Sequence, residues 1–256
     1  MMRKLLLSVV IILVVLIVVA VIVMGFFLGT IVKTGMETVG PKITQVSIKV
    51  DAVNLSLLTG SARVKGLVVG NPEGYKTPQA ISVGSAAVGV NPFSVLSDKI
   101  VVRSVRVEAP EITFEGNPFS GNNLGKIMQN VNAATKSGGP GSTNATARAD
   151  NKPGQKIEVD DFLITGAIVH VSLTGVSGKE MTLPLPDIHL TNLGKDNAGI
   201  TATDLTRRVL GAITTATVKV VASATTDIGQ GAGKAVGEGM NKITPGIGGL
   251  FKKSTN

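Results

Sequence analysis

Residues 5–28 read LLLSVVIILVVLIVVAVIVMGFFL, and no charged residue occurs from Leu5 to Val32. A helix needs about 20 apolar residues to cross the roughly 30 Å hydrocarbon core of a bilayer, and a longer run is accommodated by tilt. A helix that is apolar on every side is unsuited to the surface of a soluble domain. Residues 1–33 are therefore predicted to form a transmembrane helix that anchors the protein.

The charges beside this run predict its orientation. Arg3 and Lys4 precede it, and Lys33 is the first charge after it. Because positively charged flanks stay in the cytoplasm, we expect a single-pass protein of the bacterial inner (cytoplasmic) membrane, with a cytoplasmic N-terminus and a periplasmic body. The main alternative is a cleaved signal peptide, whose apolar core is about 7–15 residues and ends in small residues. The longer run and its bulky end favour an uncleaved anchor.

Composition limits the chemistry and the partners. The chain has a formal charge of +8, no cysteine, no tryptophan and one tyrosine. It therefore has no disulfide or thiolate chemistry, and its few aromatic residues argue against a nucleic-acid partner. Basic residues near a bilayer attract anionic head groups by about 1 kcal/mol each. We expect the membrane or a partner protein to contact the basic C-terminal tail at Lys242, Lys252 and Lys253.

The body reads mainly as strands. Val46, Ile48 and Val50 alternate with polar residues, which is the period of a half-buried strand, and they would lie on the apolar face of a groove. Short apolar runs continue to residue 116, with prolines between the runs rather than inside them. Strand character returns over 157–190, where Pro184 and Pro186 indicate an edge or irregular strand. The sequence predicts an α+β, mainly β fold with an antiparallel, curved, groove-like sheet.

Two helices and a tail complete the prediction. A short mid-chain helix is expected from apolar residues at helical spacing, capped by Asn122 or Asn123. Its apolar stripe is Leu124, Ile127, Met128 and Val131. Thr203 or Asp204 can cap a second helix, and beyond Ile228 the glycines and Pro245 predict a broken amphipathic tail.

This pattern divides the chain into three parts: a transmembrane anchor (1–33), a β-rich body (34–203) and a helical, basic, Gly-rich segment (204–256). Residues 137–155 contain no large apolar side chain. Such a segment cannot bury enough apolar area to offset the entropy of ordering, so a flexible insert is expected there, within the body.

No set of reacting groups is evident. The two histidines, His170 and His189, are far apart in sequence, and no carboxylate cluster supplies the three or four ligands of a metal site. Glu108 and Glu111 flank Ala109-Pro110 and read as solvated turn residues. We expect no enzymatic activity, no metal and no cofactor, and we expect His170 to be a structural residue of a strand.

One longer pattern resembles a known family. It comprises Lys65-Gly66-Leu67, Asn71-Pro72-Glu73-Gly74, Pro92–Leu96, Ile100-Val101, Pro110-Glu111-Ile112 and Asn123-Leu124. This order is similar to the short members of the AsmA-like family of bacterial membrane-anchored proteins. Val95-Leu96 replaces the usual bulkier pair, and residues 137–155 lie outside the pattern. The motifs are structural: Pro72 presets φ, and Gly74 can adopt a positive φ in the turn Asn71–Gly74.

The resemblance implies a function. Long AsmA-like proteins, with the TamB/AsmA-type architecture, form an apolar β-groove and are thought to carry lipid acyl chains or support outer-membrane assembly. The resemblance implies a non-catalytic envelope protein that binds phospholipid tails and assists envelope biogenesis or lipid transport. The alternative is a structural or scaffolding envelope protein with a closed β-core, which recruits other envelope proteins through its tail.

The predicted topology has a direct test. A reporter that is active only outside the cytoplasm, fused after Asn256, is expected to be active, because one membrane crossing separates the C-terminus from the basic N-terminal flank. A reporter that requires the cytoplasm should stay silent at the same position. The reverse pattern would contradict the predicted orientation.

Overall fold

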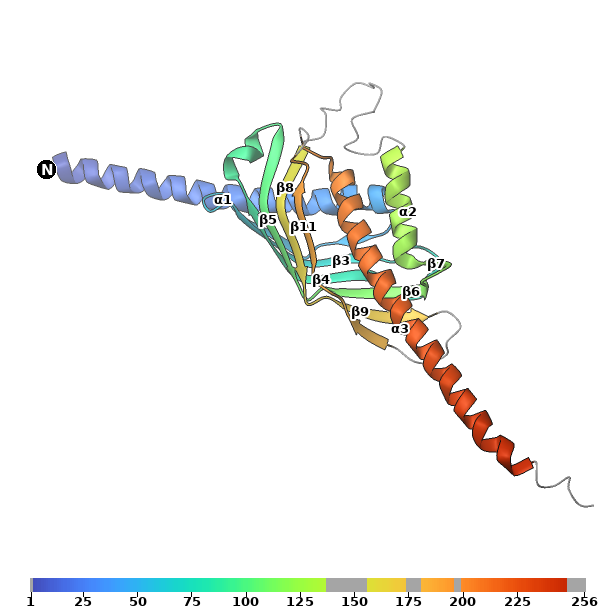
Figure 1. Ribbon diagram of the computed structural model, residues 1–256. Coiled ribbons are helices and arrows are strands. Elements are labelled where there is room, and N and C mark those ends of the chain that lie inside the picture. Colours follow the sequence, from blue (N-terminus) through green and yellow to red (C-terminus); the bar gives the residue numbers. More distant parts are fainter. Residues whose placement is uncertain (1, 137–155, 174–180, 196–198, 248–256) are drawn as a thin grey trace, which may run out of the picture.

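The computed structural model describes residues 2–136, 156–173, 181–195 and 199–247 (Figure 1). A curved sheet forms the body, α2 and α3 lie on its concave side, and α1 projects from it. The elements are α1 (Met2–Thr44), β1 (Ile48–Lys49), β2 (Ala52–Ser56), β3 (Ser61–Gly70), β4 (Gln79–Val90), η1 (Pro92–Leu96), β5 (Lys99–Glu108), β6 (Glu111–Asn117), β7 (Gly121–Asn122), α2 (Asn123–Lys136), β8 (Lys156–Thr165), β9 (Ile168–Leu173), β10 (Met181–Pro184), β11 (Ile188–Leu193) and α3 (Ala202–Ile247).

Helix α1 does not end at residue 33, where the predicted anchor ends, but continues to Thr44 as part of the body. The backbone N–H of Val50 donates to Oε1 of Glu37 at 2.9 Å. At the end of the helix, Nδ2 of the buried Asn130 donates to the carbonyl oxygen of Thr44 at 2.9 Å. These bonds attach the C-terminal part of α1 firmly to the sheet and to α2.

The sheet consists of long strands that are interrupted and bent. The long strand β4 pairs with β3 on one edge, while its other edge pairs with β5 near Ala86–Val90 and with β6 at Ile81–Ser82. The sheet then continues as β8 and β11 beyond β5, and as β9 and β10 beyond β6. Thus β5–β6, β8–β9 and β10–β11 behave as three long strands, each with one corner, and the corners separate two wings.

The three corners lie side by side and form a line across the sheet, which we call the crease: Ala109–Pro110, Gly166–Ala167 and Leu185–Asp187. Backbone hydrogen bonds join them: Ala109 N–H to Thr165 O at 2.8 Å, Ile168 N–H to Pro110 O at 3.0 Å, and Leu185 N–H to Ala167 O at 2.8 Å. The ladder therefore runs across the bend, and all three strands turn together.

Left-handed residues produce the bend. Ala109 has φ 45° and Gly166 has φ 62°, and Gly66, opposite the break between β1 and β2, has φ 60°. A single residue in this region gives the strand the local kink typical of a β-bulge. A non-glycine residue in this conformation costs roughly 1–2 kcal/mol, so Ala109 is held there by its neighbours.

The predicted antiparallel sheet is wrong in one respect, because the sheet is mixed. β5 pairs with β8, and β6 with β9, in parallel, whereas the remaining ladders are antiparallel. A parallel pair requires a crossover of a dozen residues or more, usually containing a helix. The chain between the partners, 109–155 for β5 and β8 and 118–167 for β6 and β9, contains α2 in both cases. Pro184 ends the edge strand β10, as the sequence predicted.

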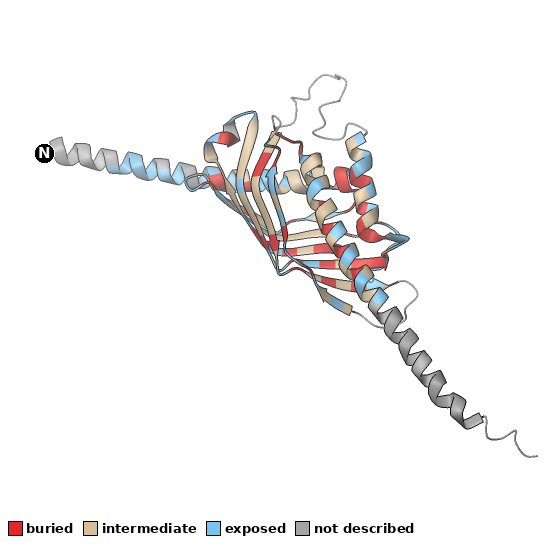
Figure 2. Ribbon diagram, in the orientation of Figure 1, coloured by how far each residue is buried: buried red, intermediate tan, exposed pale blue. Residues whose placement is uncertain are grey.

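Helix α2 covers the wing formed by β6 and β9, where burial is greatest (Figure 2). Leu124, Ile127 and Val131 of the predicted apolar stripe are fully buried in one cluster with Phe114 and Val169. Oδ1 of Asn122 accepts the N–H of Gly125 at 2.8 Å, which confirms one of the two predicted caps.

Helix α3 begins at Ala202, and its cap lies two or three residues earlier than predicted. Its cap is Thr201, whose Oγ1 accepts the N–H of Asp204 at 3.1 Å. The backbone stays helical through the Gly-rich stretch to Ile247, past Pro245, where the sequence predicted a break. Helix propensity is a weak prior, and extension of a formed helix adds one hydrogen bond for each ordered residue. The predicted flexible insert lies outside the described residues.

A buried polar network joins the β3–β4 loop to β6 and α2. The amide of Asn123 is fully buried. Its Nδ2 donates to Asn71 Oδ1 at 2.8 Å and to Thr113 O at 2.7 Å, and its Oδ1 accepts the N–H of Glu115 at 3.0 Å. Nδ2 of Asn71 in turn donates to the carbonyl oxygen of Thr77 at 2.9 Å. The network fixes α2 against this wing of the sheet.

Glu115 is the only acid of this network. Its Oε1 accepts the N–H of Lys76 at 2.7 Å, and its Oε2 accepts the N–H of Thr77 at 3.0 Å and the Thr77 hydroxyl at 2.8 Å. Burial favours the neutral acid, but the hydrogen bonds from Thr77 and Lys76 outweigh it, so the pKa of Glu115 is lowered.

The crease predicts different responses to the same substitution at two glycines. Gly166→Ala is expected to destabilise the protein by about 1 kcal/mol, because alanine is strained at positive φ. Gly84→Ala in β4 is the matched control, since an added Cβ meets open space there, and it should change stability by less than about 0.5 kcal/mol. Thermal unfolding of the full chain in detergent, followed by circular dichroism, measures both. Equal effects would contradict a strained corner.

The lowered pKa of Glu115 gives its hydrogen bonds a pH dependence. A depressed folded-state pKa stabilises the protein above the unfolded pKa, about 4.3, and this contribution is lost as the pH falls through the folded pKa. Glu115→Gln should cost about 1.5–3 kcal/mol at neutral pH, the typical worth of hydrogen bonds to a charged group. The difference from wild type should shrink in acid, whereas the exposed control Glu108→Gln should show neither effect.

Candidate functional site

An apolar hollow of about 290 Å³ lies between the concave face of the sheet and α3; we call it the chamber. Its wall follows the inside of the crease, where it is formed by Val107, Pro110 and Ile112. The remaining sheet strands contribute Leu67, Val69, Ile81, Val83, Phe162, Ile164 and Ile188, and the helices, with the chain after α1, contribute Thr44, Ile48, Ile127, Leu205, Thr206, Val209, Leu210 and Ile213. The only polar side chains in this lining are two threonines.

The position of α3 explains why the chamber is not filled. α3 packs chiefly on α2 and reaches the sheet at β11 and β8. Leu210 and Ile213 are buried toward the sheet. A straight helix that rests on α2 and on the far wing spans the concave bend without following it (Figure 1). The hollow inside the crease is what remains beneath it.

The lining determines what the chamber can hold. No charged group lies in the wall, and a water molecule needs two to four polar partners to be stable in a cavity. An apolar cavity of about 150 Å³ already accommodates benzene. The chamber is therefore suited to hydrocarbon and unsuited to ions or polar metabolites.

The structure places the predicted groove residues in different surroundings. Ile48 lines the chamber. Val46 and Val50 are buried, and β1 itself is only two residues long. These three residues therefore do not form one strand face that is open to the chamber.

The other predicted site residues lie elsewhere. The turn Asn71–Gly74 belongs to the polar network: Pro72 is buried, Gly74 has φ 92°, and Glu73 is exposed. Lys252 and Lys253 lie outside the described residues, and the structure describes no side chain for Lys242.

Sequence reasoning missed most of the chamber. Its sheet residues belong to apolar strand runs that were identified, but which residues share one hollow depends on strand pairing and on the crease. Pro110, which belongs to one of the family motifs, was a local signal of the crease, because proline interrupts a hydrogen-bond ladder.

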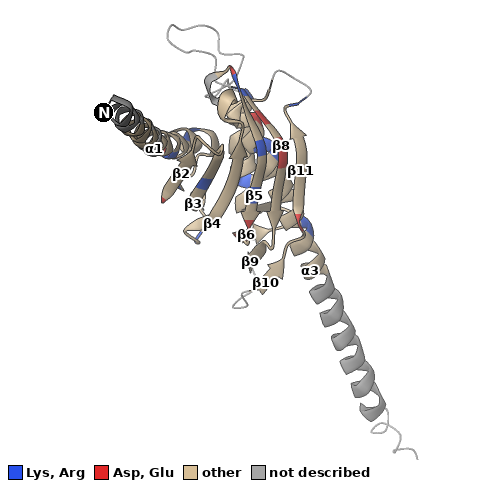
Figure 3. Cartoon of the chain, turned by 90° about the vertical axis from the view of Figure 1, so that its left-hand side faces the viewer, with Lys and Arg blue, Asp and Glu red and all other residues tan. Residues whose placement is uncertain are grey.

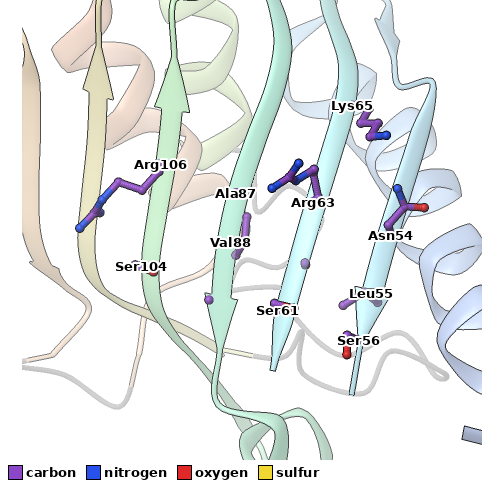
Figure 4. Close-up of a pocket in the computed structure, with 12 residues that line it drawn as sticks. Asn54, Leu55, Ser56, Ser61, Arg63, Lys65, Ala87, Val88, Ser104 and Arg106 are labelled. Atoms are coloured by element: carbon purple, nitrogen blue, oxygen red, sulfur yellow. The ribbon is translucent and has the colours of Figure 1, made fainter. Parts of the chain in front are cut away.

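The outer face of the sheet carries the charges of the strands (Figure 3). A shallow trough there is floored by the small residues Ala87 and Gly89 and edged by Arg63, Lys65 and Arg106. Arg63 extends toward β4, Lys65 toward β2, and Arg106 toward β8 (Figure 4). The three cations diverge, so this trough does not form one anion site.

Arg106 is engaged by an acid. It pairs with Oδ2 of Asp161, and Nε2 of His189 lies 2.5 Å from Oδ1 of the same carboxylate. The hydrogen bonds from His189 and Arg106 lower the pKa of Asp161. His189 of β11 therefore contacts a carboxylate of the neighbouring strand β8. His170 is half-exposed on β9, 3.4 Å from the Thr182 hydroxyl. In the described ranges, no group of three or more His, Asp or Glu residues is placed to hold a metal ion.

Two helices of the described part are long and apolar enough to cross a membrane: α1 over Ile11–Thr44 and α3 over Ala202–Thr226. Over its most apolar 18 residues the α1 segment has the higher mean hydropathy, 3.5 against 1.3, and only 7% of that stretch is buried. The α3 segment is the one that covers the chamber.

Comparison with known proteins supports the pattern seen in the sequence. No curated protein and no solved structure matches the chain. The sequence model of the AsmA family matches residues 1–191, a range that extends from the apolar helix through the crease and the chamber strands to β11. The chain belongs to the AsmA family of envelope-associated bacterial proteins.

Proposed function

We propose that this protein binds the acyl chain of a lipid in the chamber and thereby assists lipid transport or envelope biogenesis. The observation that supports the proposal is the hollow of about 290 Å³ whose lining carries no charge and only two hydroxyl groups. Burying apolar lipid surface there gains roughly 25 cal/mol for each Å² removed from water. A polar ligand would lose its hydration without finding partners.

In this proposal α1 is the membrane anchor and α3 belongs to the body. The apolar side chains that the structure describes from Ile11 to Met24 are predominantly exposed, as expected of a lipid-facing helix. The charges in the flanks favour a cytoplasmic N-terminus and a periplasmic body. The chamber would then lie in the periplasm, beyond the end of the apolar run of α1.

The protein is proposed to be non-catalytic, since a lipid carrier needs no reacting group. A scaffold with a closed core remains the competing hypothesis, and α3 does cover the apolar face as a closed core requires. A closed core, however, is packed to a density near 0.75 with few voids larger than a water molecule. The unfilled chamber favours binding over a scaffolding role.

A photoreactive lipid tests the proposal. The full chain is placed in nanodiscs that contain phosphatidylethanolamine with a diazirine on one acyl chain, irradiated and mapped by peptide mass spectrometry. We expect adducts on chamber residues of β3, β5 and α3 in addition to α1, since α1 is exposed to the bilayer. Adducts confined to α1 would contradict lipid binding in the chamber while supporting the anchor.

A filled chamber provides the matched variant. Val209 is half-buried and lines the chamber, so Val209→Trp should occupy the hollow and lower chamber labelling several-fold. Thr226→Trp places the same side chain at an exposed position of α3, away from the lining, and should leave labelling unchanged. Because the indole enters existing space, Val209→Trp should not lower the melting temperature.

A further inference from the structure

The body carries few exposed large apolar side chains, and two of them lie at one place. Among the body residues whose side chains the structure describes, only Leu58, Phe93 and Phe119 are such residues, with exposures of 74%, 86% and 76%. Leu58 lies in the β2–β3 turn and Phe93 in η1, whereas Phe119 lies in the β6–β7 turn. Single exposed apolar residues are common, but an adjacent pair indicates a contact surface.

The turns that carry Leu58 and Phe93 are neighbours. The N–H of Val90 donates to the carbonyl oxygen of Gly60 at 2.6 Å, which joins the end of the β2–β3 turn to the start of the β4–β5 connection. A Cβ added at Gly60 would lie 2.9 Å from Pro92, the first residue of η1. We call this end of the sheet, residues 57–60 and 91–96, the tip.

The tip points along α1 toward its apolar part. The strand β2 runs beside the helix: a Cβ added at Gly29 would overlap the carbonyl oxygen of Val53, and one at Gly25 would lie 2.8 Å from that of Leu55. Four helical residues rise about 6 Å, and two strand residues cover about 6.6 Å. The step from Gly29 to Gly25 along α1 therefore matches the step from Val53 to Leu55 along β2, so the two elements run side by side. Leu58 therefore lies farther toward the N-terminal part of α1, alongside the uncharged run.

The length of α1 then determines where the tip lies relative to the bilayer. About 20 residues span the hydrocarbon core, and Leu5–Met24 supplies that length before Gly25, which lies against β2. The uncharged run continues to Val32, so the part of α1 beside β2 has no charge that would hold it in water. The tip reaches past Gly25 into the zone where the bilayer begins.

The attachment of α1 and a nearby cation suit this position. Nζ of Lys33 donates to the carbonyl oxygen of Asp51 at 3.1 Å, which adds to the bonds that fix α1 to the body. Behind the tip, the exposed guanidinium of Arg103 donates to the carbonyl oxygen of Val90 at 3.0 Å. A cation just behind exposed apolar residues is the arrangement of a segment that rests in the membrane interface, with the charge at the head groups.

From these observations we propose that the tip is immersed in the interface of the bilayer that α1 crosses, with Leu58 and Phe93 among the acyl chains and Arg103 at the phosphates. The inference rests on the proposed anchor function of α1. It places one end of the creased sheet on the membrane surface, so that the body meets the bilayer through a second contact beside the helix.

The cysteine-free chain makes the test direct. Single-cysteine variants of the full chain, Leu58→Cys, Phe93→Cys, Phe119→Cys and Val15→Cys, are labelled with an environment-sensitive fluorophore in liposomes of phosphatidylethanolamine and phosphatidylglycerol. Quenching by nitroxide lipids reports contact with the bilayer, and quenching by iodide reports contact with water. Val15 monitors the span of α1, and Phe119 is the exposed apolar control outside the tip.

We expect the labels at residues 58 and 93 to be quenched by nitroxide lipids and several-fold less by iodide than the label at 119. Water-exposed labels at 58 and 93 with a lipid-exposed label at 15 would overturn the inference but keep the anchor. Labels at 58 and 93 shielded from both quenchers would mean a protein contact, such as a second copy, and would also overturn it. A water-exposed label at 15 would instead refute the anchor itself.

A paired substitution gives a second readout. Leu58→Ser with Phe93→Ser removes the apolar groups from exposed positions, so the melting temperature in detergent should not change. In liposomes, the label at a third tip position, Thr59→Cys, should then gain iodide quenching several-fold. Unchanged quenching at Thr59 with the two serines present would contradict immersion of the tip through these side chains.

Discussion

The bend at the crease is the constraint on which the rest of the structure depends. Three neighbouring strands turn a corner together, and backbone hydrogen bonds continue from one corner to the next. Two of the corners contain a residue with positive φ, Ala109 and Gly166. An untwisted or smoothly curved sheet would let a covering helix touch it along its length. A creased sheet cannot be covered in this way, because an α-helix bends only gently.

The two helices meet this constraint differently. α2 is short enough to lie within one wing, where its apolar stripe is buried completely. α3 is long and passes over the crease, so its side chains meet the far wing and α2 but leave the inside of the bend empty. The chamber is thus a consequence of backbone geometry rather than of small side chains, since its lining consists mainly of valine, leucine and isoleucine.

Much of this architecture could be predicted from the sequence, and there is a physical reason why the rest could not. The apolar helix α1, the strands before residue 116 and the α2 stripe follow from local composition and periodicity. The parallel ladders depend on which strand the crossover selects, a non-local choice. Ala109 gives no local sign of positive φ, because alanine avoids it and only the neighbouring ladders hold it there. Predicting the chamber would require both the non-local strand pairing and the positive φ at the crease. Of the predicted groove residues, only Ile48 lines it.

The hydrogen bonds that hold the two helices determine which wall of the chamber would move to admit a ligand. α2 is tied to the sheet by the buried amide of Asn123 and to the end of α1 by the buried amide of Asn130. In the described part of α3, by contrast, the buried hydroxyls of Thr214 and Thr217 have no hydrogen-bond partner. Displacing α2 would leave buried donors and acceptors without partners, at a cost of about 1–3 kcal/mol for each group. Displacing α3 would instead expose mainly apolar surface, which an entering acyl chain would cover again. In the proposed function a lipid would therefore enter beneath α3, with α2 and the crease as the fixed wall.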